Sequence, residues 1–81
     1  MLILKTRLKE LRGISRTSQK QVAFSVGISC TQYQRYEYGK QDPTSKVLTA
    51  LADYFNVSID YLVGRTDVPE TNTKTNGNNK S

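Results

Sequence analysis

Apolar residues recur along the chain at the spacing of amphipathic helices. In "LKTRLKELR", Leu4, Leu8 and Leu11 lie four and three positions apart, which places one apolar stripe on an otherwise charged helix. We expect this helix to span residues 4–12 and to stop near Gly13.

Two shorter helix patterns follow, over residues 18–26 and 29–38. Each opens on serine with glutamine three positions later, as a capping box requires, and each closes on glycine: Ser18 with Gln21 before Gly27, and Ser29 with Gln32 before Gly39. In the second pattern Tyr33, Tyr36 and Glu37 share the side expected to face inward.

The second half of the chain predicts two more helices and a polar tail. Thr44 follows the Pro43 turn as a plausible N-cap, and apolar residues recur at helical spacing over 45–55. Ser58 begins a last short helix that Gly64 ends. We therefore expect an all-α, five-helix domain over residues 1–66 and a polar, disordered tail over residues 67–81.

Composition removes most enzyme classes. The chain has 81 residues, one cysteine and no histidine, so an internal disulfide is impossible and imidazole chemistry is excluded. We find no nucleophile–base pair, no metal-ligand cluster and no phosphate-cradling glycine loop, and we expect no enzyme, no cofactor and no metal. No apolar run reaches membrane-spanning length and no export signal opens the chain, so we expect a cytoplasmic protein.

Positive charge is concentrated in the first half. Residues 1–46 hold nine Lys and Arg against three acids, whereas residues 47–70 hold one against four. The first half could therefore face a polyanion, although an ordinary solvated basic surface explains the charge equally well.

The glycine at position 27 favours the first interpretation, a basic half that faces a polyanion. A short turn containing glycine sets two helices at a steep angle, as in a helix-turn-helix motif. The helix after the turn has a polar outer face, on which arginine can bind guanine and glutamine or threonine can reach other base edges in a major groove. That outer face consists of Thr31, Gln34, Arg35 and Tyr38.

With these residues in place, the segment "SQKQVAFSVGISCTQYQRYEYGKQDPTSKVLTALADYFNVSIDYLVG" resembles the Cro/repressor-type (XRE) helix-turn-helix family, which is related to lambdoid phage repressors. The resemblance runs from about Leu4 to Arg65 and implies a lambda-repressor-like fold. It also implies three groups of site residues. Base readers would be Cys30, Thr31, Gln34 and Arg35; phosphate contacts would be Ser18, Gln19, Tyr38, Lys40, Gln41 and Thr44; Arg12 and Glu37 would form a structural ion pair.

Three features depart from the family pattern. The segment "ISRTSQ" has Arg16 and Thr17 where the family has glycine and an aliphatic residue, and we expect Ile14 to supply the missing apolar contact. Phe24 stands at a normally polar position, where it either packs against the first helix or belongs to an exposed partner patch. Cys30 replaces a polar base reader, and its thiol is only a weak donor.

The sequence thus predicts a regulator, expected to be a repressor, that binds double-stranded DNA in a sequence-specific manner. We expect a homodimer that reads two half-sites, with a dimer surface around Tyr61, Leu62 and Val63, and no small-molecule ligand or membrane partner. The alternative is an antitoxin or anti-regulator that acts mainly through a protein partner, which Phe24 and the unusual loop would support.

Overall fold

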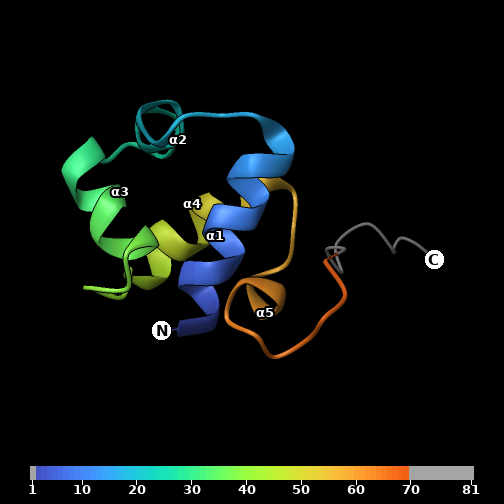
Figure 1. The fold of residues 1–81 in the computed structure, drawn as a ribbon. Coiled ribbons are helices and arrows are strands. Elements are labelled where there is room, and N and C mark those ends of the chain that lie inside the picture. Colours follow the sequence, from blue (N-terminus) through green and yellow to red (C-terminus); the bar gives the residue numbers. More distant parts are fainter. Residues whose placement is uncertain (1, 70–81) are drawn as a thin grey trace.

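The computed structural model describes residues 2–69, and this part of the chain contains helices and connecting turns only. The helices are α1 (Leu2–Ser15), α2 (Gln19–Val26), α3 (Cys30–Glu37), α4 (Ser45–Phe55) and α5 (Ile59–Leu62). In Figure 1, α1 and α4 occupy the middle of the molecule, α2 and α3 lie together on one side, and α5 lies at the other end. The all-α, five-helix prediction is confirmed.

One core joins the five helices. α1 packs on α3 and α5, and α4 packs on α2 and α5. Each helix contributes side chains that are almost completely buried, namely Leu4, Leu8, Val22, Ala23, Tyr33, Tyr36, Leu51, Ala52 and Leu62, and Val57 joins them from the loop before α5. The apolar stripe predicted on the first helix is therefore the stripe that packs.

Serine and threonine caps fix where four of the helices begin. Ser18, Ser29, Thr44 and Ser58 each accept a hydrogen bond from the backbone N–H three residues later. Only the first forms a complete capping box, because the Gln21 side chain returns to the Ser18 amide. The second predicted box is half correct: the Gln32 side chain donates instead to the Tyr36 hydroxyl, at 2.7 Å.

The first helix ends later than the sequence predicts. α1 continues through Gly13 to Ser15, and Arg16 then adopts a left-handed backbone conformation (φ 56°) that ends it. The expectation for Ile14 is wrong as well, because its side chain is 80% exposed and supplies no core contact. A glycine in a helix costs only about 1 kcal/mol relative to alanine, which the packing of the Leu4–Leu8 stripe outweighs.

The segment after α5 returns to α1. Arg7 stacks its guanidinium over the Tyr61 ring, 3.8 Å from the ring centroid, and forms an ion pair with Asp67 at 2.9 Å. The Ser58 amide donates to the Pro69 carbonyl at 3.0 Å. Leu62 is completely buried and Tyr61 lies under Arg7, so the dimer surface expected around these residues is wrong for Leu62. The predicted tail lies outside the described residues from residue 70 onward.

Candidate nucleic-acid interface

The α2–turn–α3 unit is held by a left-handed glycine. Gly27 (φ 80°) follows α2, and its amide donates to the Ala23 and Phe24 carbonyls. The next amide, of Ile28, returns to the Ala23 carbonyl at 3.0 Å, and the Ile28 side chain packs on the core. These bonds end α2 and set the direction in which α3 begins.

α3 has one buried side and one outward side. Tyr33, Tyr36 and Glu37 are at most 1% exposed, whereas Thr31 and Arg35 lie on the exposed side. Lys40 and Gln41 follow on the exposed loop, where their amides bond to the Arg35 carbonyl. Threonine and arginine thus project from a helix that its tyrosines anchor from behind.

Cys30 differs from the other expected base readers. It is half-buried and packs against the core at the first position of α3. Its thiol borders a groove and is not presented outward in the way that Thr31 and Arg35 are. The structure therefore brings Thr31 and Arg35 together on the outer face and leaves Cys30 at its edge.

The first turn of α2 can face an anion through its backbone. The capping box occupies the Ser18 and Gln21 amides, which leaves the Gln19 and Lys20 amides as the unpaired N–H groups that begin the helix. The side-chain oxygen of Ser18 is engaged in the cap, as is that of Thr44 at the start of α4. Each of these hydroxyl oxygens accepts a hydrogen bond in its cap, so its own hydrogen can still be donated to an anion.

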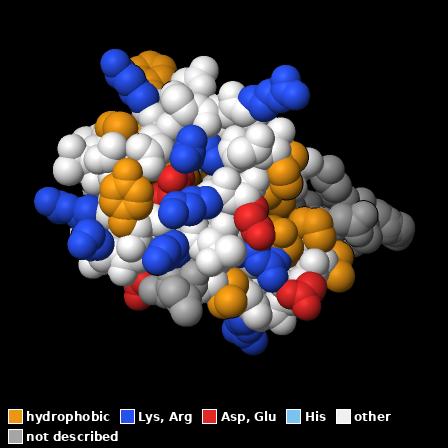
Figure 2. Space-filling view, viewed as in Figure 1, with side chains coloured by type: hydrophobic (Ala, Val, Ile, Leu, Met, Phe, Trp, Pro, Cys, Tyr) orange, Lys and Arg blue, Asp and Glu red, His pale blue; other side chains and the backbone are white. Residues whose placement is uncertain are grey.

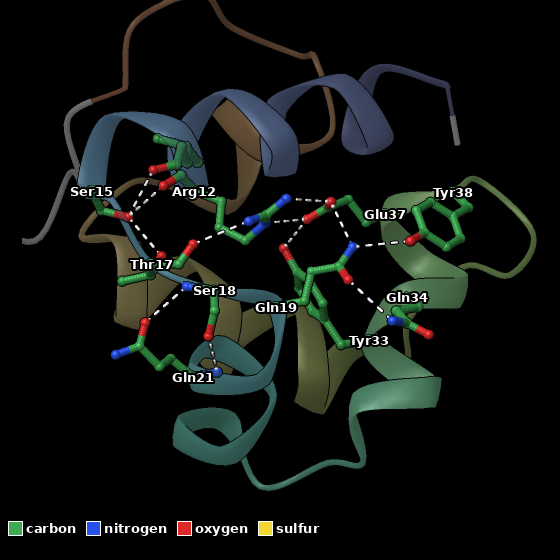
Figure 3. A network of polar contacts seen from close by, with 11 residues as sticks. Arg12, Ser15, Thr17, Ser18, Gln19, Gln21, Tyr33, Gln34, Glu37 and Tyr38 are labelled. Atoms are coloured by element: carbon green, nitrogen blue, oxygen red, sulfur yellow. Dashed lines mark hydrogen bonds and ion pairs between the residues drawn. The ribbon is translucent and has the colours of Figure 1, made fainter.

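A two-pronged ion pair ties α1 to α3. Arg12 donates from Nε to Oε2 of Glu37 at 2.8 Å and from Nη2 to Oε1 at 3.0 Å, while Nη1 reaches the Thr17 carbonyl at 3.1 Å (Figure 3). The Tyr33 hydroxyl donates to Oε2 at 2.7 Å. With Gln19 on Oε1, the buried carboxylate accepts four hydrogen bonds, which is its full capacity.

These donors keep Glu37 ionised. Burial alone raises the pKa of the Glu37 carboxyl, but the hydrogen bonds from Arg12, Tyr33 and Gln19 outweigh burial and bring the pKa below its ordinary value. Burial and the neighbouring carboxylate raise the pKa of Tyr33, so its hydroxyl remains a donor. The sequence predicted Tyr33 only as a core residue; its spacing of four from Glu37 was the signal for this second role.

Gln19 lies at the centre of the polar network. Figure 3 shows its side chain between Glu37, Tyr38 and Gln34. Its Nε2 donates to Glu37 Oε1 at 3.0 Å and to the Tyr38 hydroxyl at 3.3 Å, and its Oε1 accepts from Gln34 Nε2 at 3.1 Å. Sequence reasoning placed these residues near one another and did not find the bonds between them.

Positive charge surrounds this network. Figure 2 shows Lys and Arg side chains gathered over α1 and α3, with little exposed acidic surface among them. The only buried acid of the described residues is Glu37, and Arg12 neutralises it. The surface around α3 therefore presents a positive field to an approaching anion.

A groove opens beside α2 and the start of α3. It has a volume of about 450 Å³, and its lining includes Ala23, Ile28 and Cys30. Phe24 stands at its rim with 86% of its surface exposed, so the alternative in which Phe24 packs against α1 is wrong. Lys20 is the only charged residue of the lining.

The described residues contain no group of three side chains able to hold a metal ion. In the same part of the chain, no helix combines the length and apolar character needed to cross a bilayer.

Comparison with known proteins agrees with this geometry. The helix-turn-helix family model matches residues 8–62. The chain is 42% identical over 62 residues to the cryptic phage CTXphi transcriptional repressor RstR of Vibrio cholerae, over 76% of this chain and 55% of RstR. It is 36% identical over 66 residues to the HTH-type transcriptional regulator ImmR of Bacillus subtilis, over 82% of this chain and 52% of ImmR. The chain thus spans about half the length of these curated relatives.

A solved structure shows the same fold. The DNA-binding domain of the P22 C2 repressor superposes with a TM-score of 0.74 at 26% sequence identity, over 86% of this chain and 91% of that domain. The lambda-repressor-like fold implied by the sequence is therefore confirmed. On the match of its sequence and the arrangement of its helices, the chain belongs to the XRE-type helix-turn-helix family of transcriptional regulators.

Proposed function

We propose that this protein is a sequence-specific transcriptional repressor that inserts α3 into the major groove of double-stranded DNA. The observation that carries the proposal is the two-sided character of α3, with Thr31 and Arg35 exposed and Tyr33 and Tyr36 buried behind them. A helix fits the major groove, and an exposed arginine on it can bind the O6 and N7 atoms of guanine. The RstR and P22 C2 repressors, to which the chain is similar, support this role.

Phosphate contacts would come from the rim of the same surface. Lys40 and Gln41 follow α3, Tyr38 ends it, and the first amides of α2 point outward from the neighbouring helix. A single α3 reads only a few base pairs, so we propose a homodimer on two half-sites about 34 Å apart. The protein would act in the cytoplasm, where its DNA is.

Selection of bound duplexes from a random pool tests this proposal. The expected product is an inverted repeat whose half-site centres are 10–11 base pairs apart, about one helical turn. A selected pool no different from the input overturns the proposal. A single, unrepeated half-site would overturn the proposed homodimer but would still support base reading by α3.

The exposed Phe24 supports a second candidate, a role through a protein partner. An aromatic side chain that is 86% exposed beside an apolar groove is a feature of interaction surfaces. The Phe24→Ser variant separates the two roles, because DNA affinity should stay within about twofold of wild type if α3 alone carries function. Loss of regulation in cells with unchanged DNA affinity would favour the partner role.

A further inference from the structure

The geometry around Gln19 assigns it a role different from the phosphate contact that the family resemblance implies. We propose that Gln19 is a positioning residue, which orients Gln34 for a base edge and the Tyr38 hydroxyl for a phosphate, and whose own side chain does not touch DNA. This inference rests on the proposed function, since it concerns how the same surface reads DNA.

The orientation of the Gln19 amide follows from its neighbour. The Glu37 carboxylate can only accept, so the atom 3.0 Å from its Oε1 must be the nitrogen of the Gln19 amide. That nitrogen has two N–H groups, and it lies 3.3 Å from the Tyr38 hydroxyl oxygen, to which it donates the second. Both donors of Gln19 therefore have partners inside the protein.

A phosphate oxygen also only accepts. For its side chain to bind phosphate, Gln19 would have to withdraw an N–H from Tyr38 or from the buried Glu37 carboxylate. The bond to Glu37 is the costlier one to lose, because a buried charge would then lack one of its four donors. The network thus works against direct phosphate binding by this side chain.

The same bonds prepare two neighbours for DNA. Because the Tyr38 hydroxyl accepts from Gln19, its own hydrogen is free to be donated outward, and a phosphate oxygen is a suitable acceptor. Gln34 gives one N–H to Gln19 Oε1, which leaves its second N–H and its carbonyl oxygen. That donor and acceptor match the N7 and N6 groups of adenine.

Gln19 is in turn held by the ion pair that joins α1 to α3. Arg12 and Tyr33 fix the Glu37 carboxylate, and the carboxylate fixes the Gln19 amide. The side chain that Gln34 and Tyr38 contact is therefore placed by the buried part of the domain and not by solvent.

The test is a double-variant cycle in DNA binding. Gln19→Met keeps the length of the side chain and removes its polar atoms, and Gln34→Met does the same at the partner. Affinities and base preferences of wild type, both single variants and the double variant are measured on the selected site, on all its single-base changes and on random duplex.

We expect Gln19→Met to weaken binding to the selected site by about tenfold and to flatten the preference at the A·T pair that Gln34→Met also flattens. Gln19→Met should weaken binding to random duplex by no more than about threefold, through the Tyr38 phosphate contact, and the double variant should bind the selected site more weakly than Gln34→Met by that same small factor. An equal loss on selected and random duplex, or losses that multiply in the double variant, overturns the inference.

Gln21→Met is the matched control. This glutamine is on the same helix and its side chain accepts from the Ser18 amide, so the loss of that side chain should lower the melting temperature and leave base preference unchanged. A purely structural role for Gln19 would give this same result, and would also overturn the inference.

Side-chain amide NMR of wild type decides the matter if Gln19→Met does not fold. The Gln19 side-chain amide should show no scalar coupling to a DNA phosphorus across a hydrogen bond when random duplex is added, and such a coupling would indicate direct phosphate contact. If wild type selects no DNA sequence, the proposed function fails. If wild type selects a sequence and Arg35→Ala relaxes its base preference, but Gln19→Met weakens binding to all duplexes equally, only the present inference fails.

Discussion

Glu37 is a buried carboxylate whose charge is maintained by four hydrogen bonds. Replacing it with Gln keeps its size but removes the charge that Arg12 and Tyr33 face. Since removing one partner of a buried pair leaves the other without compensation, we expect Glu37→Gln to lower the free energy of unfolding by about 2–3 kcal/mol. Denaturant unfolding measures this, and a loss within about 0.5 kcal/mol would contradict it.

The same carboxylate makes stability depend on pH in one direction. Its folded-state pKa lies below the ordinary value of 4.5, so the unfolded chain binds the proton more readily. The stabilisation from Glu37 is thus complete above pH 4.5 and is lost as pH falls through the folded-state pKa. Melting temperatures of wild type and Glu37→Gln should therefore converge below pH 4.5. Glu10→Gln, a change at an exposed carboxylate of α1, is the matched control.

Arg35 is the exposed residue to which the proposed function assigns most of the base selection. We expect Arg35→Ala to cost about 1–3 kcal/mol on the selected site and to relax the preference at one base pair, because a base-edge contact is lost. Competition binding against each single-base change of the site is the measurement. Lys46→Ala, on the exposed side of α4, is the matched control, and a uniform loss across sequences for Arg35→Ala would make Arg35 a phosphate contact.

Three glycines provide a matched test at the level of the helices. Gly13 lies inside α1 with nothing within 4 Å of an added Cβ, so Gly13→Ala should stabilise by about 0.5–1 kcal/mol. Gly27 has the same free space but a left-handed backbone, so Gly27→Ala should destabilise by about 1 kcal/mol. At Gly64 an added Cβ would also lie 2.7 Å from Ile3, and the loss should be larger still.

Thermal unfolding of the three alanine variants measures their melting temperatures and so ranks their stabilities. The expected order of melting temperature is Gly13→Ala above wild type, then Gly27→Ala, then Gly64→Ala. A destabilising Gly13→Ala would indicate that α1 does end near Gly13 in solution.

The helices themselves could be predicted from the sequence because each carries a local signal. Ser18 with Gln21, the Gly27 turn and the leucine stripe of α1 depend on residues within one or two helical turns of one another. The end of α1 could not be predicted, because glycine at position 13 costs the helix little free energy and the packing of the rest of α1 determines where the helix ends.

The sequence could predict where some of the expected site residues lie on α3, but not the contacts among them. The spacing on a helical wheel placed Thr31 and Arg35 outward, and the structure agrees. The bond from Gln34 to Gln19 joins residues 15 positions apart, and no local pattern encodes it. The exposure of Phe24 likewise depends on how the helices pack, which no local pattern encodes.

At the scale of the molecule, the uneven charge of the two halves determines how affinity responds to salt. If about five to seven phosphates are neutralised, the logarithm of the affinity should fall with the logarithm of salt concentration with a slope of about −4.5 to −6.3. Titration of random duplex at several salt concentrations measures the slope. A slope near zero would favour the protein-partner role.

Arg7 has a consequence for how the protein can be labelled and fused. By holding Tyr61 and Asp67, it seats the segment around residue 67 against α1, and Figure 1 shows this side of the molecule turned away from α3. A fluorophore or carrier protein joined after residue 69 would begin far from the recognition surface. Reporters can therefore be attached there without obstructing α3, the helix proposed to read the duplex.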